Sequence, residues 1–256
     1  MDRDQLLGTF DMTGRVAIVT GGSRGIGRAV VGGLAAMGAR VVVASRKADA
    51  CEEAAAEVNA SGGTAIAVPT HVGDLDQLAA LVDATVAAFG GVDVVVNNAA
   101  NALAQPLGAM TPEAWQKSFD ANLRGPVFLV QQALPHLRAS AHAAVVNVIT
   151  AGVFTRASYV SMYVAAKSAM LTMTRAMAAE FVADGIRVNA LAPGTVATDM
   201  VRNAPEEMQQ SMVDAQLMPR MADPAEMVPA TLFLVSDASS FMTGQVLVVD
   251  GGLTVH

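Results

Sequence analysis

Apolar runs alternate with amphipathic stretches along almost the whole chain. The runs are rich in valine and isoleucine, and several of them, such as Val41 to Val43, are apolar at every position. Strands that helices cover on both faces of a parallel sheet have this composition. The runs predict seven strands, near residues 15–20, 40–44, 64–69, 92–96, 143–149, 186–191 and 245–249.

Helical periodicity fills the stretches between the runs. It predicts six helices, near residues 25–37, 48–60, 75–89, 111–137, 157–183 and 223–235. Asp74, Thr111 and Asp223 are typical N-cap residues at three of these starts, and a proline follows the last two directly. Alternating strands and helices imply right-handed crossovers. We therefore expect an α/β protein, a single-domain Rossmann fold over residues 1–256 with a doubly wound seven-stranded parallel sheet.

The segment near residues 195–222 fits neither a strand nor a simple connection. It contains five methionines, Met200, Met208, Met212, Met218 and Met221. Met208, Met212 and Ala215 recur at helical spacing, so one face is apolar. Because methionine is flexible and polarisable, this face suits a lid that closes over apolar ligands, and we expect Leu103 and Phe154 to line the same pocket. Packing into the core or against a partner subunit explains the pattern equally well.

Composition narrows the range of functions. The chain is 53% hydrophobic and 15% charged, with a net charge of -7, which argues against a nucleic-acid surface. No apolar run is long enough to span a membrane, and Met1 to Phe10 make a poor signal peptide. The single cysteine, Cys51, cannot form an internal disulfide, so we expect a cytoplasmic protein. The four histidines lack metal-ligand spacing, and no metal site is expected.

A glycine-rich loop follows the first predicted strand. It reads Thr20-Gly21-Gly22-Ser23-Arg24-Gly25-Ile26-Gly27, and a predicted helix comes next. Such glycines allow a tight turn, close approach of the backbone to a pyrophosphate, and close packing of helix on strand. The helix then presents free N–H groups and its positive dipole end to the phosphates. A plain turn can have a similar sequence, but the order strand, loop, helix favours a dinucleotide site.

The spacing Gly-x3-Gly-x-Gly resembles that of the short-chain dehydrogenase/reductase family, in particular its NADP-preferring carbonyl reductases and 3-oxoacyl carrier-protein reductases. The resemblance runs from about Gly14 to Leu253. Its further motifs are Asn97-Asn98-Ala99-Ala100, Asn122, Tyr163-x3-Lys167, Pro193-Gly194 with Thr198, and Asp250-Gly251-Gly252. It implies a catalytic set of Asn122, Thr150, Tyr163 and Lys167. It also implies cofactor contacts from Gly21, Ser23, Arg24, Gly25, Ile26, Gly27, Ser45, Arg46, His71, Val72, Asn98, Ala99, Tyr163, Lys167, Pro193, Gly194, Val196 and Thr198.

Tyr163 and Lys167 lie four residues apart, so on a helix they share one face. A free tyrosine titrates near about 10. A neighbouring ammonium stabilises the phenolate, so we expect a lowered pKa that lets Tyr163 act as general acid and base. The resemblance implies that Lys167 also binds the nicotinamide ribose.

Two positions depart from the family pattern. Thr150 stands thirteen residues before Tyr163, where the family has its catalytic serine. It keeps the hydroxyl, but its methyl group restricts the rotamer, and we expect reduced or substrate-restricted activity. His71 replaces the usual aspartate before Val72; it either alters the adenine contacts or is simply an exposed loop residue. Ala100 in place of glycine is a milder change.

The end of the second strand indicates the cofactor. Enzymes that prefer NAD place a carboxylate there for the adenosine ribose hydroxyls. This chain has Ala44-Ser45-Arg46-Lys47, and its next acidic residue is Asp49. Ser45 does not repel a 2′-phosphate, and Arg46 together with Arg24 suits one, so we expect NADP(H). The other interpretation is that Arg46 and Lys47 are simply solvated basic residues at the start of a helix.

The function that these features predict is NADP(H)-dependent reduction of a hydrophobic ketone or aldehyde, or oxidation of the matching alcohol. A 3-oxoacyl carrier-protein reductase is one alternative. In such enzymes basic residues flank the cleft, whereas the matching positions here are Ala141 and Asp184, with Arg138 or Arg175 as substitutes. A non-catalytic nucleotide-binding protein is another alternative, which Thr150 leaves open.

The predicted helix 157–183 is apolar on more than one side. The apolar positions are Ala165, Ala166, Ala169, Met170, Met173 and Met177. One side can pack on the sheet and another on a second subunit. Since the family usually associates through this helix and the preceding one, the resemblance implies a homo-oligomer, a dimer or tetramer.

Overall fold

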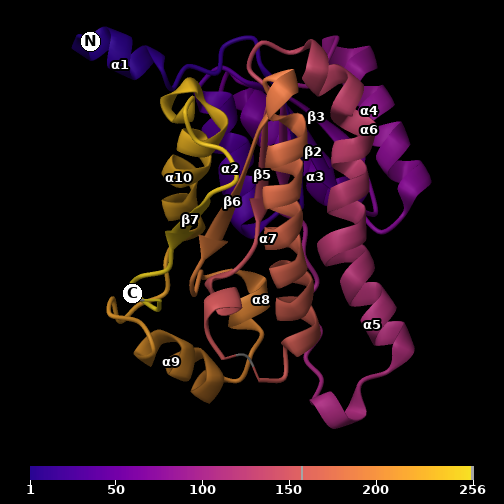
Figure 1. The fold of residues 1–256 in the computed structure, drawn as a ribbon, viewed down its shortest axis with the longest axis vertical. Coiled ribbons are helices and arrows are strands. Elements are labelled where there is room, and N and C mark those ends of the chain that lie inside the picture. The colour runs from indigo at the N-terminus through magenta and orange to yellow at the C-terminus, as the bar shows by residue number, and fades with distance from the viewer. Residues whose placement is uncertain (157, 255–256) are drawn as a thin grey trace.

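The computed structural model describes residues 1–156 and 158–254. Its centre is one seven-stranded sheet with the order β3-β2-β1-β4-β5-β6-β7, in which every neighbouring pair is parallel. The strands are β1 (Val16–Thr20), β2 (Arg40–Ser45), β3 (Thr64–Pro69), β4 (Val94–Asn97), β5 (Ala144–Val148), β6 (Arg187–Pro193) and β7 (Val246–Val249). The predicted Rossmann fold is therefore confirmed (Figure 1).

Ten α-helices are present among the described residues. They are α1 (Arg3–Gly8), α2 (Gly25–Ala36), α3 (Ala48–Ala60), α4 (Leu75–Phe89), α5 (Pro112–Phe119), α6 (Gly125–Ala139), α7 (Ser161–Phe181), α8 (Asp199–Arg202), α9 (Glu206–Asp214) and α10 (Val228–Val235). Short 3₁₀ turns join several of them. These are η1 (Leu107–Ala109), η3 (Ala151–Phe154), η4 (Val182–Asp184), η5 (Pro224–Met227) and η6 (Asp237–Ser239).

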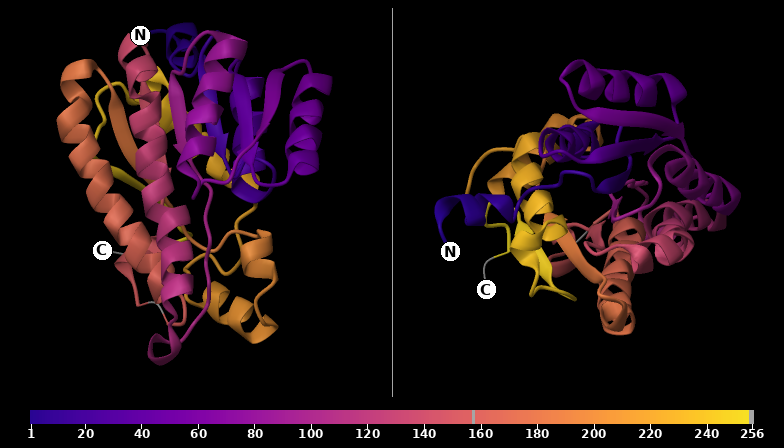
Figure 2. Two further views of the ribbon diagram at one scale, coloured as in Figure 1. Left: turned by 90° about the vertical axis from the view of Figure 1, so that its right-hand side faces the viewer. Right: turned by 90° about the horizontal axis from the view of Figure 1, so that it is seen from above.

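Side chains of the central strands point alternately into two apolar cores. In β1, Val19 packs with α2, α3 and α10, whereas Ile18 packs with α4, α6 and α7. The two sets of helices thus cover opposite faces of the sheet (Figure 2). Because both faces are buried, every residue of β1, β4 and β5 is buried, as the uninterrupted apolar runs predict.

The predicted N-caps are present at three helix starts. The Asp74 carboxylate accepts from the N–H groups of Asp76 and Gln77, and Thr111 Oγ1 accepts from Ala114. Asp223 forms a complete capping box, although the turn that it caps is η5, which leads into α10. The N-cap residues predicted these starts correctly because each cap depends only on residues within one turn of the helix.

The predicted helix 111–137 is interrupted. Residues Asp120–Arg124 form a π-helical turn, η2, in which the Gly125 N–H bonds to the Asp120 carbonyl five residues back. Gly125 lies directly against the Val72 carbonyl, so any side chain there would overlap it. A close contact with a distant loop therefore accompanies the extra residue in the turn, and helical periodicity does not reveal it.

Helices α8 and α9 lie beyond the carboxyl ends of the strands, at the bottom of Figure 1. The two ends of the segment that carries α8 and α9 lie side by side, because Val196 and Ala222 form a parallel bridge. Helix α7 begins at Ser161, four residues later than predicted. The predicted start at Ala157 lies outside the described residues, and so does His256. Within the described chain, no helix combines the length and apolarity needed to cross a membrane.

Candidate active site

The glycine-rich loop has the conformation that its sequence predicts. Gly21 and Gly25 have φ angles of 66° and 53°, in the left-handed region that favours glycine. A Cβ on Gly27 would overlap the Gly21 carbonyl oxygen, and one on Gly25 would lie 3.0 Å from Thr198 Cγ2. The loop therefore needs glycine at all three places, and it leads directly into the amino end of α2.

Asn98 holds this loop to the end of β4. Its Nδ2 donates to the Thr20 carbonyl at 2.9 Å and to the Gly21 carbonyl at 3.3 Å. In return, Thr20 Oγ1 accepts from the N–H groups of Asn98 and Ala99 at 3.0 and 3.1 Å. Asn98 and Ala99 thus lie beside the phosphate loop, and the Asn98 side chain braces it.

The loop after β6 packs over the phosphate loop. Gly194 lies so close to Asp250 that a Cβ would be 2.6 Å from Asp250 Cα. Val196 is buried beyond it, and Thr198 then contacts Gly25. Thr198 therefore lies next to the start of α2, whereas Gly194 lies against Asp250.

Arg24 does not point freely into solvent. Its Nη1 lies 3.2 Å from Asp199 Oδ2, and both side chains are mostly exposed. The phosphate loop is thereby connected to the first residue of α8, a contact that the sequence does not predict.

Ser45 and Arg46 stand where the second strand ends. Ser45 is partly buried and pairs with Pro69 of β3, whereas Arg46 is exposed and makes no ion pair with any described residue. Asp49 lies in the first turn of α3, beyond the strand end. The position that would hold an NAD-selective carboxylate therefore carries a serine followed by an unpaired guanidinium.

His71 is an exposed residue fixed by its own turn. Its Nδ1 accepts from the Gly73 N–H at 3.1 Å, and its backbone N–H donates to Gln77 Oε1. Val72, by contrast, is partly buried, and its carbonyl lies against Gly125. A role of His71 at the adenine stays a prediction.

Tyr163, Lys167 and Thr150 meet at the carboxyl edge of the sheet. Tyr163 and Lys167 lie in the first two turns of α7, and Thr150 follows β5. The Thr150 side chain interacts with Tyr163 and lowers the pKa of its phenol. Lys167 is 2% exposed; its Nζ donates to the Val148 carbonyl at 2.7 Å and lies 5.9 Å from the centroid of the Tyr163 ring.

The expected lowering of the tyrosine pKa is wrong for this arrangement. Burial raises the pKa of Tyr163 to about 12, and the interaction with Thr150 opposes this only in part. Burial likewise lowers the pKa of Lys167 to about 8. Loss of solvation dominates because the Lys167 ammonium donates to a backbone carbonyl instead of the phenolic oxygen.

Asn122 is fully buried in the π-helical turn. Its Oδ1 accepts from the Asn101 N–H at 3.1 Å, and its Nδ2 donates to the carbonyls of Asn101 at 2.7 Å and Ser118 at 2.8 Å. Both the oxygen and the nitrogen of the Asn122 side-chain amide therefore bond to backbone groups, and they position the loop after β4. Sequence reasoning missed Ser118 and Asn101, since no motif connects them with Asn122.

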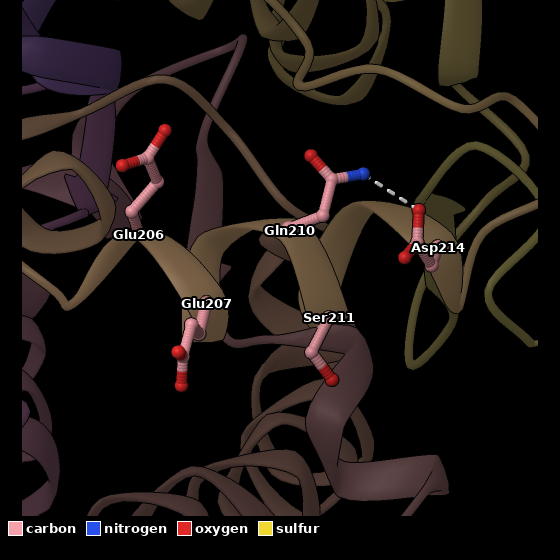
Figure 3. A pocket seen from close by; sticks show the side chains of 5 residues that line it. All are labelled: Glu206, Glu207, Gln210, Ser211 and Asp214. Atoms are coloured by element: carbon pink, nitrogen blue, oxygen red, sulfur yellow. Dashed lines mark hydrogen bonds between the residues drawn. The ribbon is translucent and has the colours of Figure 1, made fainter.

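The segment proposed as a lid has two different faces. On α9, Met208 is 41% exposed and Met212 is partly buried, whereas Glu206, Glu207, Gln210, Ser211 and Asp214 line an open pocket on another side (Figure 3). The Gln210 side chain donates to Asp214 at 2.7 Å there. None of the predicted site residues lines this acidic surface.

The positions proposed for a carrier-protein contact do not flank the cleft of this chain. Ala141 precedes β5 and Asp184 precedes β6, so both lie at the edge of the sheet opposite Tyr163. Arg138 lies at the same edge and pairs with Asp184 at 2.8 Å. That expectation was wrong because the carboxyl ends of parallel strands carry Tyr163, and these residues precede the amino ends.

Comparison with known proteins agrees with this geometry. A family model described as enoyl-(acyl carrier protein) reductase matches residues 21–254. The chain is 39% identical to cis-4-hydroxycyclohexanecarboxylate dehydrogenase of Sinomonas cyclohexanicum, covering 94% of this chain and 96% of that one. It is 36% identical to the 3-oxoacyl-[acyl-carrier-protein] reductase of Synechocystis sp., covering 95% and 98%.

A solved structure has nearly the same fold. It is described as an NAD(P)-dependent gluconate 5-dehydrogenase from Beutenbergia cavernae with bound NADP at low occupancy. The TM-score is 0.90 at 35% identity, and the match covers 96% of this chain and 99% of that one. With the phosphate loop, the Tyr163–Lys167 pair and matches of this extent, the chain belongs to the short-chain dehydrogenase/reductase family of oxidoreductases.

Proposed function

We propose that this protein is an NADP(H)-dependent oxidoreductase that interconverts a hydrophobic ketone or aldehyde and the matching alcohol. The observation that carries the proposal is the meeting of Tyr163, Thr150 and Lys167 at the edge of the sheet that also carries the phosphate loop. Dinucleotides bind at this edge in doubly wound folds. The experiment that tests it follows nicotinamide absorbance in mixtures of the protein, NADPH and a panel of ketones.

The phosphate loop fits a dinucleotide. Side chains on Gly21 or Gly27 would overlap neighbouring atoms, so the loop backbone is bare where a pyrophosphate would approach. The Pro193-to-Thr198 loop would hold the nicotinamide end, and Lys167 the ribose. When bound, the nicotinamide supplies or accepts the hydride.

Tyr163 and Thr150 then act on the substrate oxygen. In reduction, Tyr163 donates its phenolic proton to the carbonyl oxygen as hydride reaches the carbon; in oxidation it takes the proton back. Thr150 donates a hydrogen bond to the same oxygen and stabilises the charge that develops there. Asn122 does not reach the substrate in this scheme; it positions the loop that starts at Asn101.

The preference for NADP(H) rests on the second strand. Ser45 presents no carboxylate to repel a 2′-phosphate, and the exposed Arg46, which forms no ion pair with a described residue, supplies a charge for it. Arg24 forms a mostly exposed ion pair with Asp199, so a phosphate at Arg24 would compete with that carboxylate. The NADP bound to the Beutenbergia relative supports this choice of cofactor.

We propose a hydrophobic substrate. Phe154 is 38% exposed and Met208 41%, and Leu103 and Met212 are partly buried, so apolar surface is available for the proposed lid of residues 195–222. The Sinomonas relative is named for a hydroxycyclohexanecarboxylate, a cyclohexanol that carries a carboxylate, which motivates cyclohexanols and cyclohexanones with and without a carboxylate in the panel. The 3-oxoacyl carrier-protein reductase becomes the weaker candidate, since the acidic face of α9 would repel an acidic carrier.

The protein is further proposed to be a cytoplasmic homo-oligomer, a dimer or a tetramer. Cys51 is a buried free thiol, as suits a reducing compartment. Phe241 is fully exposed in the turn before the edge strand β7, and the valines and leucine of that strand are only partly buried. Burial of this exposed apolar edge against a second subunit would be favourable. Sedimentation at micromolar concentration tests the assembly, and a monomer would contradict it.

A further inference from the structure

Thr150 accepts a hydrogen bond from the backbone of its own turn. Gly152 N–H donates to Thr150 Oγ1 at 3.2 Å, where Thr150 is the N-cap of the 3₁₀ turn η3. This N–H has no other acceptor among the described residues. Because the amide occupies one lone pair of Oγ1, the hydroxyl hydrogen is directed away from Gly152.

The Tyr163 phenol interacts with the Thr150 side chain, and this interaction lowers the pKa of the phenol. With the Gly152 amide on one lone pair, the Thr150 hydroxyl hydrogen is left for the phenol or for a substrate oxygen beside it. A hydroxyl that accepts one hydrogen bond becomes a stronger donor for the next, because each bond polarises its neighbour.

We propose that the Gly152 amide is a positioning group that orients and polarises the Thr150 hydroxyl toward the reacting oxygen. The inference rests on the proposed function, since Thr150 acts there on the substrate carbonyl. It also explains how threonine serves in place of serine. A Cβ on Gly152 would lie 3.6 Å from Thr150 Cγ2 and 3.4 Å from Oγ1, at ordinary contact distances. The β-branch and the amide together hold one rotamer.

Two substitutions at position 152 distinguish the effect of losing the backbone N–H from the effect of adding side-chain volume. Gly152→Pro removes the N–H, whereas Gly152→Ala keeps it and adds a Cβ at ordinary contact distances from Thr150 and Val164. We expect kcat of Gly152→Pro to be about five- to tenfold below that of Gly152→Ala, the range for one neutral hydrogen bond, with similar KM. Circular dichroism and thermal melting of both variants establish that they are folded.

Repeating the pair in a Thr150→Ala background tests whether the effect passes through Thr150. Without the hydroxyl, the proline and alanine variants are expected to differ less than twofold in kcat. A merely structural effect of proline would lower kcat by the same factor in both backgrounds, and that result would overturn the proposal.

Amide exchange of Gly152 gives a second, independent measurement that does not need the proline variant to fold. Its exchange rate is expected to rise at least about tenfold in Thr150→Val and to stay near the wild-type rate in Thr150→Ser. An unchanged rate in Thr150→Val would contradict the hydrogen bond itself. Absence of turnover by wild-type protein across the whole panel would instead refute the proposed function, so the two failures are distinguishable.

Discussion

Lys167 donates its ammonium hydrogen bond to the carbonyl oxygen of Val148, 2.7 Å away, in a site where the lysine is 2% exposed. One backbone carbonyl replaces little of the water that a charged ammonium loses on burial. The pKa of Lys167 is consequently lowered to about 8. In the free protein this lysine loses its charge at a pH where most lysines keep theirs.

This value predicts a pH dependence of stability. Between about pH 8 and pH 10, Lys167 is charged in the unfolded chain and neutral in the folded one, so the unfolded state binds more protons and stability rises with pH. The full difference is about 3 kcal/mol, since each tenfold change in proton affinity is worth about 1.4 kcal/mol. Above about pH 10 the trend reverses, because the raised pKa of Tyr163 keeps the phenol protonated in the folded state only.

Urea unfolding at pH 7.5, 9 and 10 measures this dependence, with Lys167→Met as the matched control. The difference in unfolding free energy between wild type and variant is expected to change in favour of wild type by up to about 3 kcal/mol as pH rises. Comparing the two proteins cancels other titrating groups, Cys51 included, whose pKa burial raises. Parallel curves would show that the buried ammonium titrates normally.

Tyr163 is expected to be the proton donor. Tyr163→Phe keeps the ring and removes the transferable proton, so kcat should fall by about 10²- to 10⁴-fold while NADPH affinity is largely kept. Steady-state kinetics and calorimetric titration measure the two quantities. A variant as fast as wild type would refute the mechanism.

Thr150 is expected to follow a graded series. Thr150→Ala removes the donor to the substrate oxygen and should cost about 10²- to 10³-fold in kcat. Thr150→Ser retains the hydroxyl and the Gly152 bond, and should keep or raise kcat. If serine were as damaging as alanine, the hydroxyl would not be the group that matters.

Cofactor choice is expected to depend on Arg46 more than on Arg24. A charge-assisted phosphate contact is worth about 1.5–3 kcal/mol, so NADPH should bind at least about ten times more tightly than NADH. Arg46→Asp should largely remove this preference, whereas Arg24→Ala should reduce it less, because Asp199 already pairs with that guanidinium. Calorimetric titration with both cofactors measures the ratio; equal affinities for the wild type would contradict the assignment.

Residues 195–221 are expected to be the most mobile part of the cofactor-free protein and to become ordered with substrate. Their return to the sheet is fixed by Gln216, whose Oε1 accepts from the Thr195 N–H at 2.9 Å. Hydrogen exchange should therefore slow mainly in α8 and α9 when NADPH and substrate bind. Strong protection in both states would make the segment part of the core.

The sequence was sufficient where structure depends on neighbours along the chain. The valine runs located all seven strands, and the caps at Asp74 and Thr111 located helix starts, since these features need only a few adjacent residues. The phosphate loop followed from its glycines for the same reason.

Features that depend on distant residues were missed. The π-helical turn accompanies the contact of Gly125 with Val72, and the Asn122 amide pairs with Asn101; neither partner is visible in a local pattern. The pKa of Tyr163 was predicted in the wrong direction because spacing on α7 gives proximity to Lys167 but not burial or the alternative acceptor at Val148. Interactions across the fold are the part that the sequence leaves undetermined.

The hydrogen bonds between Asn122 and Asn101 have a consequence for which positions of this protein can vary in sequence. Asn122 contacts Asn101 through the backbone N–H and carbonyl alone, groups that nearly every amino acid has. The anchor therefore persists whatever side chain stands at position 101, and the partly exposed loop that follows, up to η1, can accept substitutions without breaking these hydrogen bonds. Sequence changes in this loop can therefore accumulate while Asn122 keeps the start of the loop in place.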